Sequence, residues 1–157
     1  MDSKNKWSFG VFAVIRPESW GNLWDNNFWL VKHNYGQKKW SLPGGGLELG
    51  EEIDRGVIRE TREETGFKIE VIDQPMAILS LKKSLGALIL FEGYIVGGAK
   101  KPNRKEILNC RIFSFKDIVA MNTKGEIYPA QFKLAELAVS LKRKRNLWPT
   151  YAWPIKT

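Results

Sequence analysis

The stretch GGLELGEEIDRGVIRETREETGF, residues 45–67, gathers acidic side chains in a chain that is basic as a whole. It carries seven Asp and Glu and three Arg residues, a net charge of −4. The whole chain carries +8, so the other residues sum to +12. A positive surface attracts polyanions, but an acidic pocket within it would repel them. A divalent cation between the two would remove this conflict. The alternative is ordinary solvated surface charge.

Residues 51–65 of this stretch are expected to form a helix, because they include good helix formers and are followed by Gly66, a common helix stop. Ile53, Val57 and Thr61 are spaced by four, which predicts one packing stripe. Before the helix, residues 43–46 are a proline followed by three glycines and cannot be helical. The glycines permit positive φ angles and close approach of backbones.

Three glutamates of the expected helix are placed so that they could bind one cation together. Glu60 and Glu64 are four residues apart and therefore lie one above the other, and Glu63 flanks them. Like charges at this spacing destabilise a bare helix by about 0.2–0.5 kcal/mol per pair. With a hard cation such as Mg²⁺ they become oxygen ligands. The alternative is an exposed acidic helix face that is neutralised by neighbouring arginines.

The remaining pattern predicts a mixed β-sheet packed between helices, because strands flank the central helix and a C-terminal helix closes the chain. The first two strands are expected to pair as a hairpin with a long loop. Strands are expected at residues 7–15, 28–33, 67–73, 75–81, 87–97 and 107–115, and helices at 116–121 and 129–146.

Length and composition limit the class of protein. A chain of 157 residues without a linker predicts a single domain over residues 1–157. Cys110 is the only cysteine, so no internal disulfide can form. No apolar run is long enough to span a bilayer, and the first ten residues lack the apolar core of a secretion signal. We therefore expect a cytoplasmic protein that does not enter a membrane.

The acidic stretch resembles the signature of the Nudix hydrolase family. One position departs from that signature: Thr61 stands where an aliphatic residue is usual, on the packing stripe and away from the carboxylates. The fixed positions of the signature are occupied by Gly45, Glu51, Arg59, Glu60, Glu63, Glu64 and Gly66, and Phe67 fits an apolar position.

The resemblance implies an α/β/α sandwich with a mixed β-sheet, in which the signature forms a loop–helix–loop. It implies hydrolysis of a nucleoside diphosphate linked to another group, with Mg²⁺ or Mn²⁺ as cofactor. Glu60 and Glu64 would be the main metal ligands, Glu63 would add a ligand or a water contact, and the Gly45 carbonyl would face a metal. The side chains of Glu60 and Glu64 should then be exposed to a cleft. Arg59 would orient the glutamates by salt bridges.

The general base is left open among several carboxylates. Glu106, just before the strand expected at residues 107–115, is favoured because it resembles a late glutamate of some family members. Glu92 lies inside an apolar strand and is the competing late candidate. Glu63 and Glu51, inside the signature, are next in line.

The substrate is expected to be a nucleoside triphosphate or a nucleotide sugar. The charge of +12 outside the acidic stretch favours one alternative, the 5′ end of RNA, because each Lys or Arg contact to a phosphate adds affinity. A second alternative is a nucleotide-binding regulatory module without turnover. The intact set of carboxylates argues against that module.

Several aromatic residues could stack on a base, although core packing is the favoured interpretation for each. These are Trp20, Trp24 and Trp40. His33, the single histidine, is expected at a strand end and not as a catalyst. Trp148 and Trp153 in the C-terminal tail are expected to cover apolar surface, and a homodimer interface is one candidate.

Overall fold

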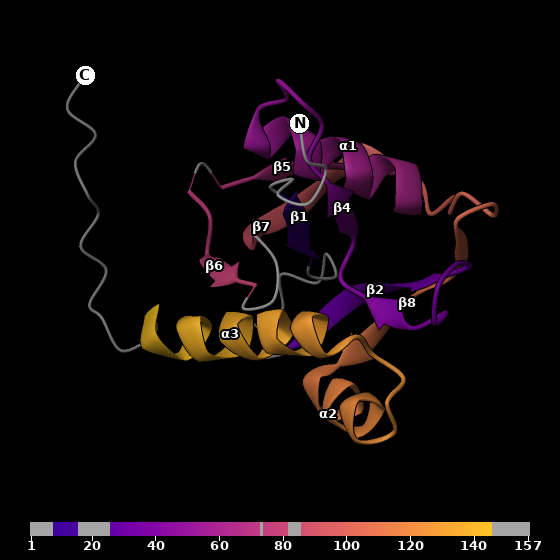
Figure 1. Ribbon diagram of the computed structural model, residues 1–157, viewed down its shortest axis with the longest axis vertical. Helices are drawn as coiled ribbons and strands as arrows, with labels where there is room; N and C mark the ends of the chain where they lie inside the picture. Colours follow the sequence, from indigo (N-terminus) through magenta and orange to yellow (C-terminus); the bar gives the residue numbers. More distant parts are fainter. Residues whose placement is uncertain (1–7, 16–25, 73, 82–85, 146–157) are drawn as a thin grey trace, which may run out of the picture.

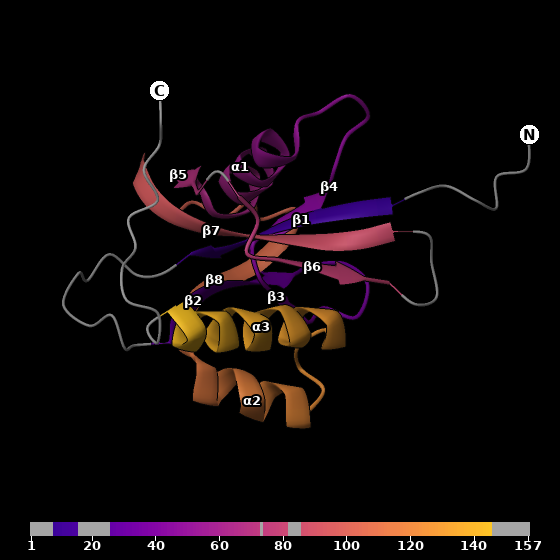
Figure 2. The ribbon, with the colours of Figure 1, turned by 90° about the vertical axis from the view of Figure 1, so that its left-hand side faces the viewer.

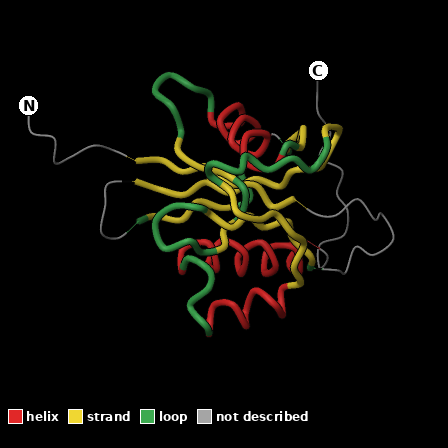
Figure 3. Tube along the Cα trace, turned by 90° about the vertical axis from the view of Figure 1, so that its right-hand side faces the viewer, coloured by secondary structure: helices red, strands yellow, loops and turns green. Residues whose placement is uncertain are grey.

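The chain folds into three layers, with strands between helices (Figures 1 and 2). The computed structural model describes residues 8–15, 26–72, 74–81 and 86–145. Helix α1 (Ile53–Thr65) covers one side of the strands, and α2 (Phe115–Thr123) and α3 (Pro129–Arg145) cover the other. Figure 3 shows the same order from the opposite side. The expected α/β/α sandwich is therefore confirmed.

The strands form two sheets. The five-stranded sheet has the order β4–β1–β7–β5, and β6 also pairs with β7; the other sheet has the order β3–β2–β8. Strands β1 and β7 run parallel and the other pairs are antiparallel, so the larger sheet is mixed as expected. The bounds are β1 (Ser8–Ile15), β2 (Asn27–His33), β3 (Trp40–Ser41), β4 (Gly44–Gly46), β5 (Phe67–Val71), β6 (Ala77–Ser80), β7 (Gly86–Gly98) and β8 (Ile107–Ser114).

The expected hairpin of the first two strands is wrong. Strand β1 pairs with β4 and β7, whereas β2 pairs with β3 and β8 in the other sheet. Two strands that follow each other in sequence are separated, and the position of β1 between β4 and β7 allows both of its faces to be buried.

Strand β1 contributes to two hydrophobic cores. Val11, Ala13 and Ile15 pack with Val57 of α1 in one core. The alternate residues of β1, Phe12 and Val14, belong to the core that includes α2 and α3. Burial on both faces explains why the β1 sequence is a continuous apolar run and not an alternating one.

Helix α1 lies where the sequence predicts it, two residues shorter at its start. Gly66 ends it in the left-handed conformation, with φ of 83°, and its N–H donates to the carbonyl of Arg62. In the predicted packing stripe, Val57 and Thr61 are fully buried, but Ile53 in the first turn is largely exposed.

The glycine run before α1 is strand β4, which pairs with β1. Gly44 has a φ of 143°, and a side chain there would collide with the carbonyl of Val11. Glycine at this position therefore allows β4 to lie against β1 and below α1. In the part of the chain that the structure describes, no helix is both long and apolar enough to cross a membrane.

Candidate metal and catalytic site

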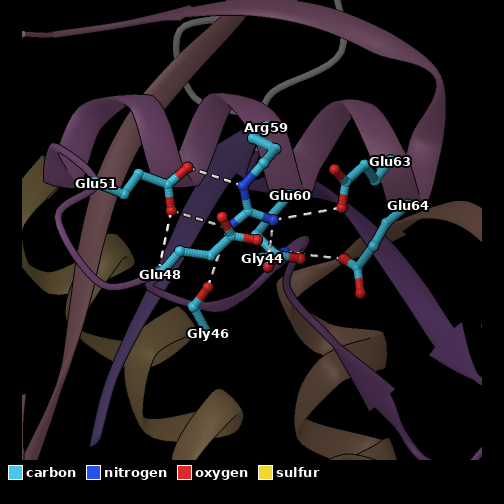
Figure 4. Close-up of polar contacts among 8 residues, drawn as sticks. All are labelled: Gly44, Gly46, Glu48, Glu51, Arg59, Glu60, Glu63 and Glu64. Carbon is cyan, nitrogen blue, oxygen red and sulfur yellow. Dashed lines mark hydrogen bonds and ion pairs between the residues drawn. The ribbon is translucent and has the colours of Figure 1, made fainter.

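Arg59 organises the acidic residues of the predicted site (Figure 4). Its guanidinium donates to both carboxylate oxygens of Glu51, at 2.8 and 2.9 Å. It also donates to Glu60 at 2.8 Å and to Glu63 at 3.3 Å. Its fifth contact is the carbonyl of Gly46 in β4, at 3.1 Å. Since a guanidinium is planar and always charged, one side chain positions three carboxylates against one strand.

Glu51 serves this arrangement as a fixed anion. It accepts a hydrogen bond from the backbone N–H of Glu48, at 3.1 Å, in addition to its two bonds from Arg59. The bonds from Arg59 and from this N–H lower the pKa of Glu51 to about 2. A carboxylate with so low a pKa is a poor proton acceptor near neutral pH. The geometry therefore supports a positioning role for Glu51 and counts against it as the general base.

Glu60 lies against the backbone of Gly45. A Cβ atom at Gly45 would be 2.5 Å from Glu60 Oε2, so only glycine leaves room for this carboxylate. Partial burial raises the pKa of Glu60, and the negative charges of Glu64 and Glu63 act in the same direction, against the lowering effect of Arg59. The three predicted ligands are thus close enough to repel one another.

Glu64 is buried, with 4% of its surface exposed, although the sequence predicts a residue open to a cleft. Its Oε2 accepts a hydrogen bond from the N–H of Gly44, at 2.9 Å. Its Oε1 lies 3.5 Å from Nε2 of His33 in β2. Burial raises the pKa of Glu64. Glu64 is buried, and not open to a cleft, because the last turn of α1 packs against β4 and the end of β2.

The side chains on this face fit a hard divalent cation in chemistry, although they do not form a finished cage. In the described ranges, no three Asp, Glu, His or Cys side chains converge closely enough to hold a metal ion. The donors are carboxylate oxygens, which Mg²⁺ prefers. Glu63 and Glu64 stand in the last turn of α1, where negative charge is unfavourable. A cation beside Glu60, Glu63 and Glu64 would relieve both this effect and their mutual repulsion.

Glu106 lies at the same end of the molecule as the carboxylates. It directly precedes β8, and its backbone carbonyl accepts a hydrogen bond from the N–H of Asn34, just after β2, at 2.7 Å. Asn34 directly follows His33, which approaches Glu64, so the backbone of Glu106 lies close to the ligand group, and its side chain is exposed.

Glu92 lies on another face. Its neighbour Phe91 packs in the core beneath α1, and successive side chains of a strand point to opposite faces. Glu92 therefore points away from α1, towards the side of α3. Of the two late candidates, Glu106 is therefore the one whose backbone lies beside the ligand group, bonded to the residue that follows His33.

His33 and Tyr35 are the residues beside the site that the sequence pattern did not indicate. His33 ends β2, as expected, but it also approaches Glu64 and stacks on Tyr35, with ring centroids 4.7 Å apart and planes 16° apart. The only local sequence signal for Tyr35 was an aromatic residue directly after a strand. The contact between His33 and Glu64 joins residues 31 positions apart in the sequence.

Of the tryptophans weighed as stacking residues, Trp40 is buried in the core with Leu42 and Leu134, so core packing is confirmed for it. Trp20, Trp24, Trp148 and Trp153 lie outside the described residues.

The fold and the acidic signature together define a NUDIX domain, and the family profile with that description matches residues 5–135. The chain therefore belongs to the Nudix hydrolase family, as the sequence predicted. This family in general uses divalent metal ions and acts on nucleotide substrates. The predicted class of enzyme, a Nudix hydrolase, is confirmed at the level of the family.

Known proteins resemble the chain in sequence and in structure. A protein of Caenorhabditis elegans named as nudix hydrolase 1 is 34% identical over 85 residues, which are 52% of this chain and 22% of that protein. A MutT-like protein of Streptomyces ambofaciens is 42% identical over 50 residues, 32% of each chain. The chain thus matches about a fifth to a third of the length of these relatives.

Among solved structures, an ADP-ribose pyrophosphatase from Streptococcus suis superimposes with a TM-score of 0.66 and 25% identity, covering 94% of this chain and 96% of that one. A MutT protein from Methanosarcina mazei gives a TM-score of 0.68 and 25% identity, covering 92% and 99%. These likenesses extend over nearly the whole chain, beyond the acidic signature.

Proposed function

We propose that this chain is a metal-dependent pyrophosphohydrolase that cleaves a nucleoside triphosphate or a nucleotide sugar, and that residues 1–157 form one domain. The observation that carries the proposal is the pair of carboxylates Glu60 and Glu64, held one helical turn apart against the glycine strand β4. Relatives named as a pyrophosphatase and a MutT protein share the fold. Their names support the class of reaction.

The residues that would hold Mg²⁺ or Mn²⁺ are Glu60, Glu63 and Glu64, together with the carbonyl of Gly45. When bound, such a metal neutralises charge on the phosphate oxygens and lowers the pKa of a bound water. Arg59 holds Glu60 and Glu63 in place and keeps part of their negative charge balanced before substrate arrives. Because these contacts are made by a rigid guanidinium, little reorganisation is needed when substrate binds.

Hydrolysis requires a group that accepts a proton from the attacking water while the bond between phosphorus and the bridging oxygen breaks. We assign this role to Glu106, because its side chain is exposed and its backbone is bonded to Asn34, the residue after His33, which approaches Glu64. Glu63 is the second candidate, since its side chain is 52% exposed and it is held by a single contact from Arg59. A positioned base typically contributes about 10²–10⁴-fold in rate.

A substrate panel tests the proposed function. Release of phosphate or pyrophosphate is measured with nucleoside triphosphates, nucleotide sugars, ADP-ribose and triphosphorylated RNA, with Mg²⁺ or with EDTA. We expect cleavage of at least one small nucleotide that depends on the metal and is lost in Glu60→Gln. Glu52→Gln, a change to an exposed acid just before α1, is the matched control and should leave the rate unchanged. Tight binding of a nucleotide without any turnover would instead support a regulatory module.

The 5′ end of RNA is a second candidate substrate, favoured by a basic loop beside the site. This loop runs between β7 and β8 and exposes Lys100, Lys101, Arg104 and Lys105. The N–H of Lys101 donates to the carbonyl of Thr65 at the end of α1, at 2.7 Å. The carbonyl of Lys105 accepts from the side chain of Asn34, at 3.3 Å. The loop therefore connects the two elements that carry Glu64 and His33, where the backbone of a longer nucleic acid would extend.

A further inference from the structure

An exposed aromatic ring stands next to the carboxylate group, on a different element from the metal ligands. Tyr35 follows β2 and is 54% exposed. One face of its ring is stacked on His33, with centroids 4.7 Å apart. His33 itself lies 3.5 Å from Glu64. Tyr35 is therefore separated from a predicted metal ligand by a single side chain, and its surface away from His33 faces solvent.

The backbone around Tyr35 is fixed by a tight turn. The N–H of Lys38 donates to the carbonyl of Tyr35, at 3.0 Å, and Gly36 and Lys38 both have positive φ angles, of 56° and 51°. The N–H of His33 donates to the carbonyl of Lys39, at 3.2 Å, which closes the same turn. A ring mounted on so constrained a turn loses little conformational entropy when a ligand stacks on it.

The ring beneath Tyr35 is also held firmly. His33 is buried and contacts Tyr128, with ring centroids 5.6 Å apart. The hydroxyl of Tyr128 would lie 3.6 Å from a Cβ atom at Gly36, so Tyr128 lies against the turn as well. Tyr35, His33 and Tyr128 thus form a supported aromatic group with one large exposed surface. We name this group, defined by these three residues, the aromatic platform.

We propose that Tyr35, the exposed face of the aromatic platform, is a stacking subsite for the base of the nucleotide whose pyrophosphate is held at Glu60 and Glu64. This inference rests on the proposed function and adds to it the residue that recognises the nucleoside. A planar base binds an exposed aromatic ring through its π-face, largely independently of which base it is. Exposure, support from below and proximity to Glu64 are the three properties that such a subsite requires.

The test compares ligands with and without a base. The nucleotide that the wild type cleaves fastest in the substrate panel is replaced by its α,β-methylene analogue. In this analogue a CH₂ group replaces the oxygen between the α and β phosphates, so that this linkage cannot be hydrolysed. Methylenediphosphonate serves as the ligand without a base. Dissociation constants are measured by calorimetry in Mg²⁺ for the wild type and for Tyr35→Leu, Tyr35→Ser and Tyr35→Phe. Tyr94→Leu is the matched control, because Tyr94 is similarly exposed, at 51%, but lies on β7.

We expect both ring-less variants to weaken binding of the nucleotide analogue by roughly 5- to 100-fold. Tyr35→Phe and Tyr94→Leu should bind it like the wild type, and all the variants should bind methylenediphosphonate equally. Undiminished binding of the analogue by folded Tyr35→Leu or Tyr35→Ser would overturn the proposal. An equal loss for both ligands would also overturn it, because Tyr35 would then act on the metal site through His33.

The failure of this inference can be told apart from failure of the proposed function. If the wild type cleaves none of the nucleotides and binds none of their analogues, the proposed function is wrong and the base subsite falls with it. If the wild type cleaves and binds them but loss of the Tyr35 ring has no effect, only the base subsite is wrong.

Discussion

At the scale of single residues, the site depends on two glycines that allow carboxylates to touch a strand. Gly44 donates its N–H to Glu64, and Gly45 leaves the space that the Glu60 carboxylate fills. The adjacent Gly46 has open space in the direction of a side chain, with no atom within 4 Å. Neighbouring positions of one strand therefore make different demands, which mutagenesis can separate.

Gly45→Ala should displace the Glu60 carboxylate without unfolding the protein, because the added Cβ meets the mobile end of a side chain. We expect turnover to fall by about tenfold or more, in line with about 1.4 kcal/mol of lost transition-state stabilisation, and the Mg²⁺ concentration for half-maximal rate to rise. Gly46→Ala should behave like the wild type. Metal titrations of the rate on both variants measure the difference, and equal behaviour of the two would contradict this view of Glu60.

Glu64→Gln should stabilise the metal-free protein and abolish its response to metal. Burial raises the pKa of Glu64, which means that its charge is unfavourable in the folded state at neutral pH. A gain of about 1 kcal/mol would appear as a rise of about 2–4 °C in melting temperature. Added Mg²⁺ should raise the melting temperature of the wild type, because it binds the folded state, but not that of the variant.

The measurement is thermal unfolding with EDTA and with Mg²⁺, with Glu52→Gln as the control that should keep the response of the wild type. A Glu64→Gln protein that gains as much stability from Mg²⁺ as the wild type would remove Glu64 from the set of ligands.

Glu106→Gln should lower the maximal rate by about 10²–10⁴-fold if Glu106 accepts the proton, with little change in melting temperature because the side chain is exposed. Glu92→Gln should leave the rate unchanged, since Glu92 points away from α1. Rate, Mg²⁺ dependence and melting temperature are compared for the two variants. If Glu106→Gln turns over normally, Glu63 becomes the candidate base.

The sequence was enough to propose Glu60, Glu63 and Glu64 as candidate ligands, because one helix carries them at spacings that local geometry determines; their role as ligands stays a prediction. It missed the place of His33 and Tyr35 because their approach to Glu64 depends on how β2 packs against the end of α1. That contact joins residues 31 positions apart and leaves no periodicity in either segment. Burial of Glu64 escaped the sequence for the same reason, since β4 and β2 together cover it.

At the scale of elements, helix α1 was predicted well because its end has a local signal. Gly66 adopts a left-handed conformation that other residues rarely accept, so it ends the helix regardless of the surroundings. The pairing of β1 has no such signal. Its partners are β4 and β7, and the register with β7 joins segments that are far apart along the chain. An apolar run shows that a strand is buried, but not which neighbours bury it.

The entry to α1 is secured by the Glu51–Arg59 contact, which should give stability a specific dependence on pH. The pKa of Glu51 is lowered to about 2 in the folded state, from 4.5. The contribution of the contact is therefore fully present above about pH 4.5 and is lost as the pH falls towards 2. The difference in melting temperature between the wild type and Glu51→Gln should shrink over that interval. A difference that stays constant from pH 7 to pH 3 would contradict it.

At the scale of the whole molecule, the charge is distributed so that the positive loop between β7 and β8 borders the acidic site. If RNA 5′ ends are bound, affinity should fall steeply with salt, with a logarithmic slope of about −0.7 for each phosphate contact. Changing Lys100, Lys101, Arg104 and Lys105 to Gln should flatten that slope. A small nucleotide makes few contacts outside the metal site, and its slope should remain shallow.

The control for this experiment is the surface on the other side of the strands, where Lys116, Lys124 and Lys133 lie exposed on and beside α2 and α3. Their change to Gln should leave the slope for RNA unaltered. A shallow slope in the wild type, together with rapid cleavage of nucleoside triphosphates, would exclude RNA as the substrate.

The bond from the Gly44 amide to Glu64 has a consequence for spectroscopy. Most amide protons in a sheet exchange with deuterium when strands separate, and so report on global or sub-global opening. The Gly44 proton is bonded to a side chain, and it can exchange whenever that one carboxylate swings away. In a nitrogen-15-resolved amide spectrum, the signal of the Gly44 proton should therefore report the position of the Glu64 carboxylate during a titration with metal or nucleotide, without any mutation.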